Sequence, residues 1–316
     1  MLLLQLLLTM HATVPNGGYV TSSFLIVART HMALTHSARS ETNPMNLHLE
    51  FLRRTSAGPA RFRVRDVKLG ARISNLHLVL SQEQEDGRWQ DEVEGYVTMT
   101  NIAQETGLSL ETAYTMYPPT LPVDLKTLGA TGQDTNWMIR AKDPFRQFRR
   151  AAQNIQMHLI KPERRPPDRP KSIVDQWVRF APGGRPNGRW TNDALGFLVD
   201  MFPQIVESYV NPVGEDAAIG TCNPGDLKPI IQETEARAKY WYPTLALNLD
   251  VKKLLPEDGV EWLFVRVKAK VIRNGRLDLD VEVWDEQREL VATSQHASLI
   301  VDASRNTTRN RKVTKL

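Results

Sequence analysis

Residues 244–251 read TLALNLDV, in which every second side chain is a leucine or a valine. This period of two is typical of a β-strand with one buried face. Three segments of similar character follow toward the C terminus: residues 261–272 (EWLFVRVKAKVI), 277–284 (LDLDVEVW) and 290–300 (LVATSQHASLI). The short breaks between these segments predict an antiparallel meander.

The first half of the chain repeats this plan. Its strand-like segments lie at residues 46–52 (NLHLEFL), 60–68 (ARFRVRDVK), 73–80 (ISNLHLVL) and 94–100 (EGYVTMT). A helix-like segment precedes each meander: residues 14–29, after a Pro-Asn-Gly-Gly turn, and residues 192–210, with a kink expected at Pro203. The predicted fold class is therefore α+β, with two repeats that each combine a central helix with an antiparallel sheet.

The predicted domain organisation has four parts. Residues 1–150 form an N-terminal repeat, and residues 176–303 form a C-terminal one. Between them, residues 151–175 contain the run KPERRPPDRPK, which is rich in proline and basic residues and is expected to be an irregular linker. Residues 304–316 form a basic tail.

The composition fits a folded protein and limits its partners. The 316 residues are 41% hydrophobic and 24% charged, which excludes a disordered chain and a membrane-embedded one. Cys222 is the one cysteine, so no internal disulfide can form and a reducing compartment is favoured. The net charge of +4 gives no reason to expect nucleic acid as a partner.

Both ends of the chain bear on localisation. The run MLLLQLLL at residues 1–8 is too short to span a bilayer, which takes about 20 apolar residues, and it lacks the basic region of a signal peptide. We expect it to be a buried strand and the protein to be cytoplasmic. The final residues Thr314, Lys315 and Leu316 approximate the peroxisomal S-K-L address, so a peroxisomal location is the alternative.

Several segments, in the same order, resemble the acyl-CoA thioesterase II family and its fungal thioesterase-like branch. The segments of the first half are VPNGGYV (14–20), HLEFLRRTSAGPA (48–60) and VKLGARISNLHLVLSQ (67–82). WVRF (177–180), LGFLVDMFP (195–203), TLALNLDV, EWLFVRV and VWDEQRELVATSQHASL carry the resemblance in the second half. This resemblance implies a double hotdog fold and the hydrolysis of fatty acyl-CoA by direct attack of water.

The resemblance also implies a catalytic trio. Its members are an Asp on the second helix, a Thr on the following strand and a Gln on the last strand, which correspond here to Asp200, Thr244 and Gln295. The long interval between Asp200 and Thr244 implies an inserted loop near residues 211–238. For hydrolysis by direct attack of water we expect no cofactor and no metal.

The chemistry of thioester hydrolysis gives each member of the trio a role. A buried carboxylate has a raised pKa and can take a proton from water, which suits Asp200 as a general base. The alternative is that Asp200 lies at the solvent edge of its helix. If Asp200 is the base, Thr244 and Gln295 would position the water and polarise the carbonyl through their hydroxyl and carboxamide groups.

Six residues are candidates for substrate binding. Gly17 and Gly18 would let the acyl thioester approach a helix N terminus, although a plain turn is the alternative. Arg53 and Arg54 follow a strand of the first repeat, as Lys252 and Lys253 follow the matching strand of the second. These cations are candidates for contact with the phosphates of CoA, the alternative being an ordinary solvated surface.

The first repeat is expected to be catalytically silent. When the halves are overlaid, Asn46 falls on Thr244 and Asn101 falls on Gln295, and the first helix has no carboxylate. The repeats are expected to share one substrate channel, and a homo-oligomer is possible.

Two other functions remain open at this stage. One is a hotdog enzyme that acts on acyl or polyketide thioesters, carrier-bound ones included, in a secondary-metabolite pathway. The other is a non-catalytic acyl-binding protein. A serine hydrolase or a metalloenzyme is disfavoured, because the chain has no G-x-S-x-G, no H-E-x-x-H and no paired C-x-x-C motif.

Overall fold

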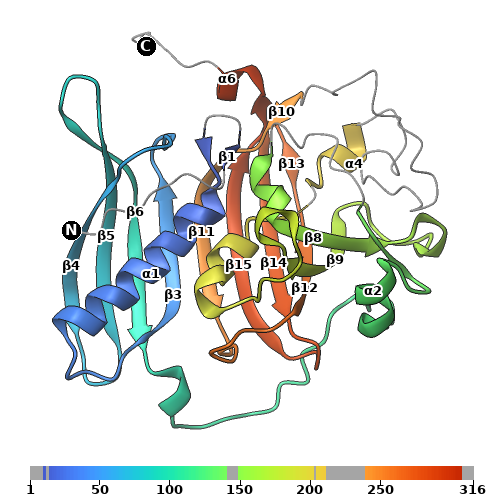
Figure 1. The fold of residues 1–316 in the computed structure, drawn as a ribbon, viewed down its shortest axis with the longest axis horizontal. Helices are drawn as coiled ribbons and strands as arrows, with labels where there is room; N and C mark the ends of the chain where they lie inside the picture. The colour runs from blue at the N-terminus through green and yellow to red at the C-terminus, as the bar shows by residue number, and fades with distance from the viewer. Residues whose placement is uncertain (1–9, 12–13, 141–148, 203, 211–238, 308–316) are drawn as a thin grey trace.

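The computed structural model describes residues 10–11, 14–140, 149–202, 204–210 and 239–307. Within these ranges the chain forms one long antiparallel sheet, and its two central helices lie side by side against one face of that sheet (Figure 1). This arrangement confirms the predicted α+β class.

The first half supplies one long helix and four strands. The helix is α1 (Gly17–Thr35). The strands are β3 (Asn43–Phe51), β4 (Arg61–Leu69), β5 (Ser74–Glu83) and β6 (Trp89–Thr100), and they pair in the order β4-β5-β6-β3. All four were predicted within a few residues.

Helix α1 begins directly after Asn16, within the predicted Pro-Asn-Gly-Gly turn. The side chain of Asn16 caps it by accepting the backbone N–H of Tyr19 at 3.1 Å. The hydroxyl groups of Thr21 and Ser23 donate to carbonyl groups one turn back, at 2.9 and 3.0 Å, so these polar side chains tolerate burial. The helix can therefore lie inside the curved sheet with polar residues on its buried face.

The second half supplies two short helices in its predicted helical segment and seven strands along the main path of the same sheet, with β13 (Ile272–Arg273) paired to its side. The helices are α3 (Leu195–Leu198) and α4 (Glu207–Val210), within the predicted 192–210 segment. The strands are β7 (Trp137–Ile139), β8 (Ile155–Ile160), β9 (Ile173–Phe180), β11 (Thr244–Val251), β12 (Trp262–Lys268), β14 (Arg276–Trp284) and β15 (Leu290–Leu299). They pair in the order β11-β15-β14-β12-β9-β8-β7.

The two halves join through the antiparallel pair β3 and β11. Leu47 lies opposite Leu249, and Leu49 lies opposite Leu247, with all four side chains buried in one core. Because this pair continues the backbone hydrogen bonding across the junction, the halves share a sheet and a core and are not separate domains.

The predicted linker is wrong in part. Residues 155–160 form strand β8, which pairs with β9 and with β7, so they belong to the sheet of the second half. The shorter run between Lys161 and Ser172 is free of strands and links β8 to β9, and residues 151–154 belong to a 3-10 turn. We propose that the repeats divide instead in the connection 101–124, which contributes no strand to the sheet.

The overlay of the two repeats is also off in register. A β-bulge interrupts β3 between Pro44 and Asn46, and a matching bulge interrupts β11 between Thr244 and Ala246. Aligning the bulges places Pro44, not Asn46, at the position of Thr244. The pairing of β6 and β15 then places Tyr96, not Asn101, at the position of Gln295.

The remaining elements are short. They are β1 (Met10–His11), β2 (Val14–Pro15), β10 (Tyr240–Trp241), β13 (Ile272–Arg273), β16 (Val301–Asp302), α2 (Leu125–Thr131), α6 (Ser304–Thr307) and the 3-10 turns η1 (Ile102–Gln104), η2 (Arg150–Asn154), η3 (Pro162–Arg164), η4 (Pro182–Gly184) and η5 (Asn192–Ala194). No helix among the described residues is both long enough and apolar enough to cross a membrane. The predictions for residues 1–8, Pro203, the 211–238 loop and the C-terminal tripeptide lie outside the described residues.

Candidate active site

Asp200 follows helix α3 and meets the N terminus of helix α1. Its Oδ2 atom accepts the backbone N–H of Gly18 at 2.8 Å and the side-chain amide of Asn16 at 3.1 Å. The carboxylate of the second repeat is thus held by donors of the first. Helix N termini favour such negative charge because their first N–H groups have no partner within the helix.

Two glycines allow this close contact between the helices. A Cβ atom on Gly18 would lie 2.7 Å from the carbonyl oxygen of Phe197 and 2.8 Å from Cβ of Asp200. On Gly196 it would lie 2.6 Å from the backbone nitrogen of Ser22. Any larger residue at either position would push the helices apart and lengthen the hydrogen bonds to Asp200.

The contact is reciprocal and shows what replaces Asp200 in the first repeat. The backbone N–H of Phe197 donates to the hydroxyl oxygen of Ser22 at 2.8 Å, as that of Gly18 donates to Asp200. Ser22 therefore occupies the place that Asp200 holds in the second repeat. A hydroxyl group cannot serve as a base near neutral pH, so the first repeat lacks this part of the site.

Thr244 is brought to Asp200 as predicted. Its hydroxyl donates to Asp200 Oδ1 at 3.4 Å, from the first residue of β11. Burial raises the pKa of Asp200 to about 6, while the hydrogen bonds from Gly18, Thr244 and Asn16 oppose that rise. A carboxylate with this pKa is ionised at neutral pH yet basic enough to accept a proton.

The structure does not bring Gln295 to this pair. Gln295 is exposed on the outer face of β15, where it lies between Asn248 and Asp280 of the neighbouring strands. Because side chains alternate across a strand, the adjacent His296 faces inward instead. Its Nδ1 atom lies 3.7 Å from Asp200 Oδ1, so the structure places His296, and not Gln295, beside the pair.

His296 is neutral at this position. Burial lowers its pKa to about 4, with partial compensation from the backbone carbonyl of Val199. The hydroxyl of Ser294 donates to the carbonyl of Asn248 at 2.6 Å, and its oxygen lies 3.1 Å from His296 Nε2.

A pocket of about 190 Å³ opens over the pair. Asp200 and Thr244 line it, together with Gly17, Arg53 and Arg54 from the first repeat. Three of the six predicted substrate-binding residues thus line the pocket. A fourth, Gly18, supports the carboxylate through its backbone.

Lys252 and Lys253 do not line this pocket. Since β3 and β11 run antiparallel, the residues after each strand lie at opposite ends of the pair. Lys252 comes eight residues after Thr244, which is about 26 Å along an extended strand. Lys252 instead contacts Asp250 at 3.5 Å, and Lys253 forms ion pairs with Asp285 and Glu289.

One group of potential metal ligands occurs within the described part of the chain, away from this pocket. His31 and His36 each contact a different oxygen of Asp66, at 2.8 and 2.9 Å. His31 lies 14 residues along α1 from Gly17, or about 21 Å at the rise of a helix. The hydrogen bonds with Asp66 account for this cluster.

A continuous sheet around two central helices, with a carboxylate held at the junction of the repeats, defines a double hotdog enzyme. The profile of the acyl-CoA thioesterase N-terminal domain matches residues 8–100, and that of the acyl-CoA thioesterase C-terminal domain matches residues 122–300. The chain belongs to this acyl-CoA thioesterase family, and it is a thioester hydrolase.

Individual proteins are also similar to this chain in sequence or in fold. The thioesterase-like protein TwmA of Talaromyces wortmannii is 33% identical over 309 residues, covering 93% of this chain and 86% of its own length. The acyl-CoA thioesterase II TesB2 of Mycobacterium marinum has the same fold, with a TM-score of 0.53 and 15% identity over 94% of this chain and 91% of that one. A hot dog fold protein of Alicyclobacillus acidocaldarius also has this fold, with a TM-score of 0.56 and 16% identity over 92% of this chain and 88% of that one.

Proposed function

We propose that the chain hydrolyses acyl-CoA to a free acid and CoA, with Asp200 as the general base. The observation that carries this proposal is a carboxylate whose pKa burial raises to about 6, on the wall of a pocket between the repeats. A base with a pKa near the working pH combines the correct protonation state with useful proton affinity.

The two oxygens of Asp200 have different surroundings, which selects the one that acts. Oδ2 is occupied by the donors Asn16 and Gly18. Oδ1 lies beside the hydroxyl of Thr244 and the ring of His296. A water held between Oδ1 and the thioester would lose its proton to Oδ1 as its oxygen attacks the carbonyl carbon.

The rest of the reaction needs charge stabilisation and a returned proton. The N terminus of α1, with Gly17 on the pocket wall, directs its positive end toward the oxygen that becomes negative in the tetrahedral intermediate. When that intermediate collapses, the carbon–sulfur bond breaks and the proton held by Asp200 passes to the leaving thiolate. Thr244 and His296 act as positioning residues for Asp200 and the water.

The test is thiol release from a panel of acyl-CoA substrates that differ in chain length. Wild-type protein should release CoA, and the Asp200→Asn variant should lower turnover by roughly 10²- to 10⁴-fold, the usual effect of losing a general base. Asp86→Asn, in an exposed loop, is the matched control and should keep full activity. Equal turnover of Asp200→Asn and wild type would exclude Asp200 as the base.

A further inference from the structure

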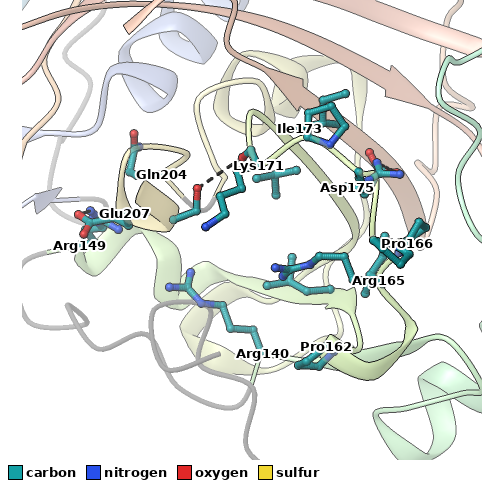
Figure 2. A pocket seen from close by; sticks show the side chains of 17 residues that line it. Arg140, Arg149, Pro162, Arg165, Pro166, Lys171, Ile173, Asp175, Gln204 and Glu207 are labelled. Atoms are coloured by element: carbon teal, nitrogen blue, oxygen red, sulfur yellow. Dashed lines mark hydrogen bonds and ion pairs between the residues drawn. The ribbon is translucent and has the colours of Figure 1, made fainter. Parts of the chain in front are cut away.

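A second pocket, of about 590 Å³, lies beside the Asp200 pocket and shares Gln204 with it. Two carboxylates, Asp175 and Glu207, line this basic pocket. Five cationic side chains also line it: Arg140, Arg149, Arg165, Arg169 and Lys171. Figure 2 shows the charged groups of Arg140, Arg165 and Lys171 directed toward its middle. The wall of the pocket thus carries a formal charge surplus of three.

Part of this surplus is buried. Asp175 accepts two hydrogen bonds from Arg266, at 2.7 and 2.8 Å, and also forms an ion pair with Arg169 at 2.6 Å. All three side chains are buried, so one carboxylate serves two guanidinium groups. A buried charge without full compensation is costly, and an anion in the adjoining pocket would offset that cost.

A shared wall joins this basic pocket to the active site. Glu207 lines the basic pocket, and its Oε1 atom accepts the hydroxyl of Tyr242 at 2.7 Å and a guanidinium N–H of Arg149 at 3.2 Å. Tyr242 lines the Asp200 pocket, whereas Arg149 lines the basic one. The two pockets are therefore neighbours on either side of one hydrogen-bonded partition.

The rim of the basic pocket is stiff. It contains Pro162, Pro166, Pro167 and Pro170 from the segment between β8 and β9. Proline fixes its φ angle, so such a segment loses little conformational entropy when a ligand binds. Arg165, Arg169 and Lys171 are carried by this same segment.

We propose that this basic pocket binds the phosphate groups of CoA while the thioester lies against Asp200. The inference rests on the function proposed for the Asp200 pocket and names the part of the substrate that the neighbouring pocket holds. CoA carries its diphosphate and its ribose phosphate at the far end of the pantetheine arm from the thioester. Guanidinium groups suit such phosphates because their paired N–H groups match two phosphate oxygens.

The test compares two thioesters of the same acyl group, one on CoA and one on N-acetylcysteamine, which has no phosphate. For Arg140→Gln and for Arg165→Gln, the ratio of kcat/KM for the CoA ester to that for the short ester should fall about 10-fold, equivalent to about 1.4 kcal/mol. Arg276→Gln, an exposed cation at the start of β14, is the matched control and should leave the ratio unchanged. An unchanged ratio in both pocket variants, with both esters hydrolysed, would refute the inference and leave the proposed function standing.

Calorimetry with free CoA and dephospho-CoA tests the pocket without catalysis. CoA should bind more tightly than dephospho-CoA, and Arg165→Gln should weaken CoA binding about 10-fold. If no thioester is hydrolysed, the proposed function fails, and this titration still decides the pocket. Equal CoA binding by Arg165→Gln and wild type overturns the inference. The inference also fails if the pocket variants lose activity toward an acylated carrier protein but keep it toward acyl-CoA.

Discussion

The backbone N–H of Gly18 donates to Asp200 Oδ2 at 2.8 Å, although the two residues are 182 positions apart and belong to different repeats. Asn16 adds a second donor from the same side, at 3.1 Å. The carboxylate of one repeat is therefore oriented by the helix N terminus of the other. Five predictions follow from this shared site and from its surroundings.

The first prediction concerns the pH dependence of the rate. Burial raises the pKa of Asp200 to about 6, and a general base must be ionised, so kcat/KM should fall below about pH 6 and level off above it. The measurement is thiol release at subsaturating acyl-CoA between pH 4.5 and 8.5. A rate that is flat through pH 6 would mean that another group titrates in the rate-limiting step.

The second prediction concerns the cost of keeping Asp200 ionised. Because the pKa of Asp200 is raised in the folded state, its contribution to the free energy of unfolding is most favourable below the unfolded pKa of 3.8. That contribution is lost as the pH rises through about 6. At pH 8 the ionised carboxylate should lower the free energy of unfolding by on the order of 3 kcal/mol. Urea unfolding should show Asp200→Asn stabilising the protein more at pH 8 than at pH 4.5, and an equal effect at both values would contradict this.

The third prediction separates two neighbouring residues. Gln295 lies on the exposed face of β15, so Gln295→Ala should change kcat by less than about twofold, as surface substitutions do. His296 lies 3.7 Å from Asp200, so His296→Ala should lower kcat about 10-fold or more by removing a positioning group. Circular dichroism checks that both variants are folded. The opposite order of effects would restore Gln295 to the site.

The fourth prediction compares Thr244 with Asn46, a polar residue on the paired strand β3 that lies away from the pocket. Thr244→Ala removes a hydrogen bond to the carboxylate and should lower kcat about 10-fold, the effect of about 1.4 kcal/mol. Asn46→Ala removes an amide that donates to Asp250 at 2.9 Å, away from the pocket, and should leave kcat within about twofold. Comparable losses in the two variants would mean that the effect of Thr244→Ala does not come from its contact with Asp200.

The fifth prediction concerns the isolated second half. Residues 122–316 retain Asp200 and Thr244 but lose the donors Asn16 and Gly18 and expose the edge of β11. Unpaired strand edges associate, so this fragment should be aggregated or oligomeric and have little activity. Adding residues 1–121 should restore thiol release. A monomeric, fully active fragment would show that the repeats function independently.

Periodicity gave reliable strands wherever one face is apolar. Residues 244–251 coincide with β11, and Leu247 and Leu249 at alternate positions mark its buried face. Asp200 and Thr244 were found from the resemblance, and the structure places them together. Their donors Asn16 and Gly18 could be identified only as a turn, because nothing local indicates that the turn meets a residue 182 positions away.

The errors have equally physical causes. In β15 the inward positions are Ser294, His296 and Ser298, so no apolar alternation distinguishes its two faces. Gln295 was predicted from the family motif, and the alternation within this strand gave no sign that Gln295 faces outward while its neighbour His296 faces inward. Strand β8 was missed because it is a short apolar run directly before a segment dominated by proline and arginine.

The absence of a side chain at Gly18 constrains how this lineage can change. Substitution at Gly18 is harmful while Phe197 and Asp200 press against it, and a longer residue at position 200 is harmful while Gly18 holds the helices together. In an alignment of relatives, positions 18 and 200 should therefore vary jointly or remain fixed jointly. A duplicated gene that loses the carboxylate at position 200 can also accept a larger residue at position 18. The residues at these two positions would then distinguish the copies that have kept the reaction.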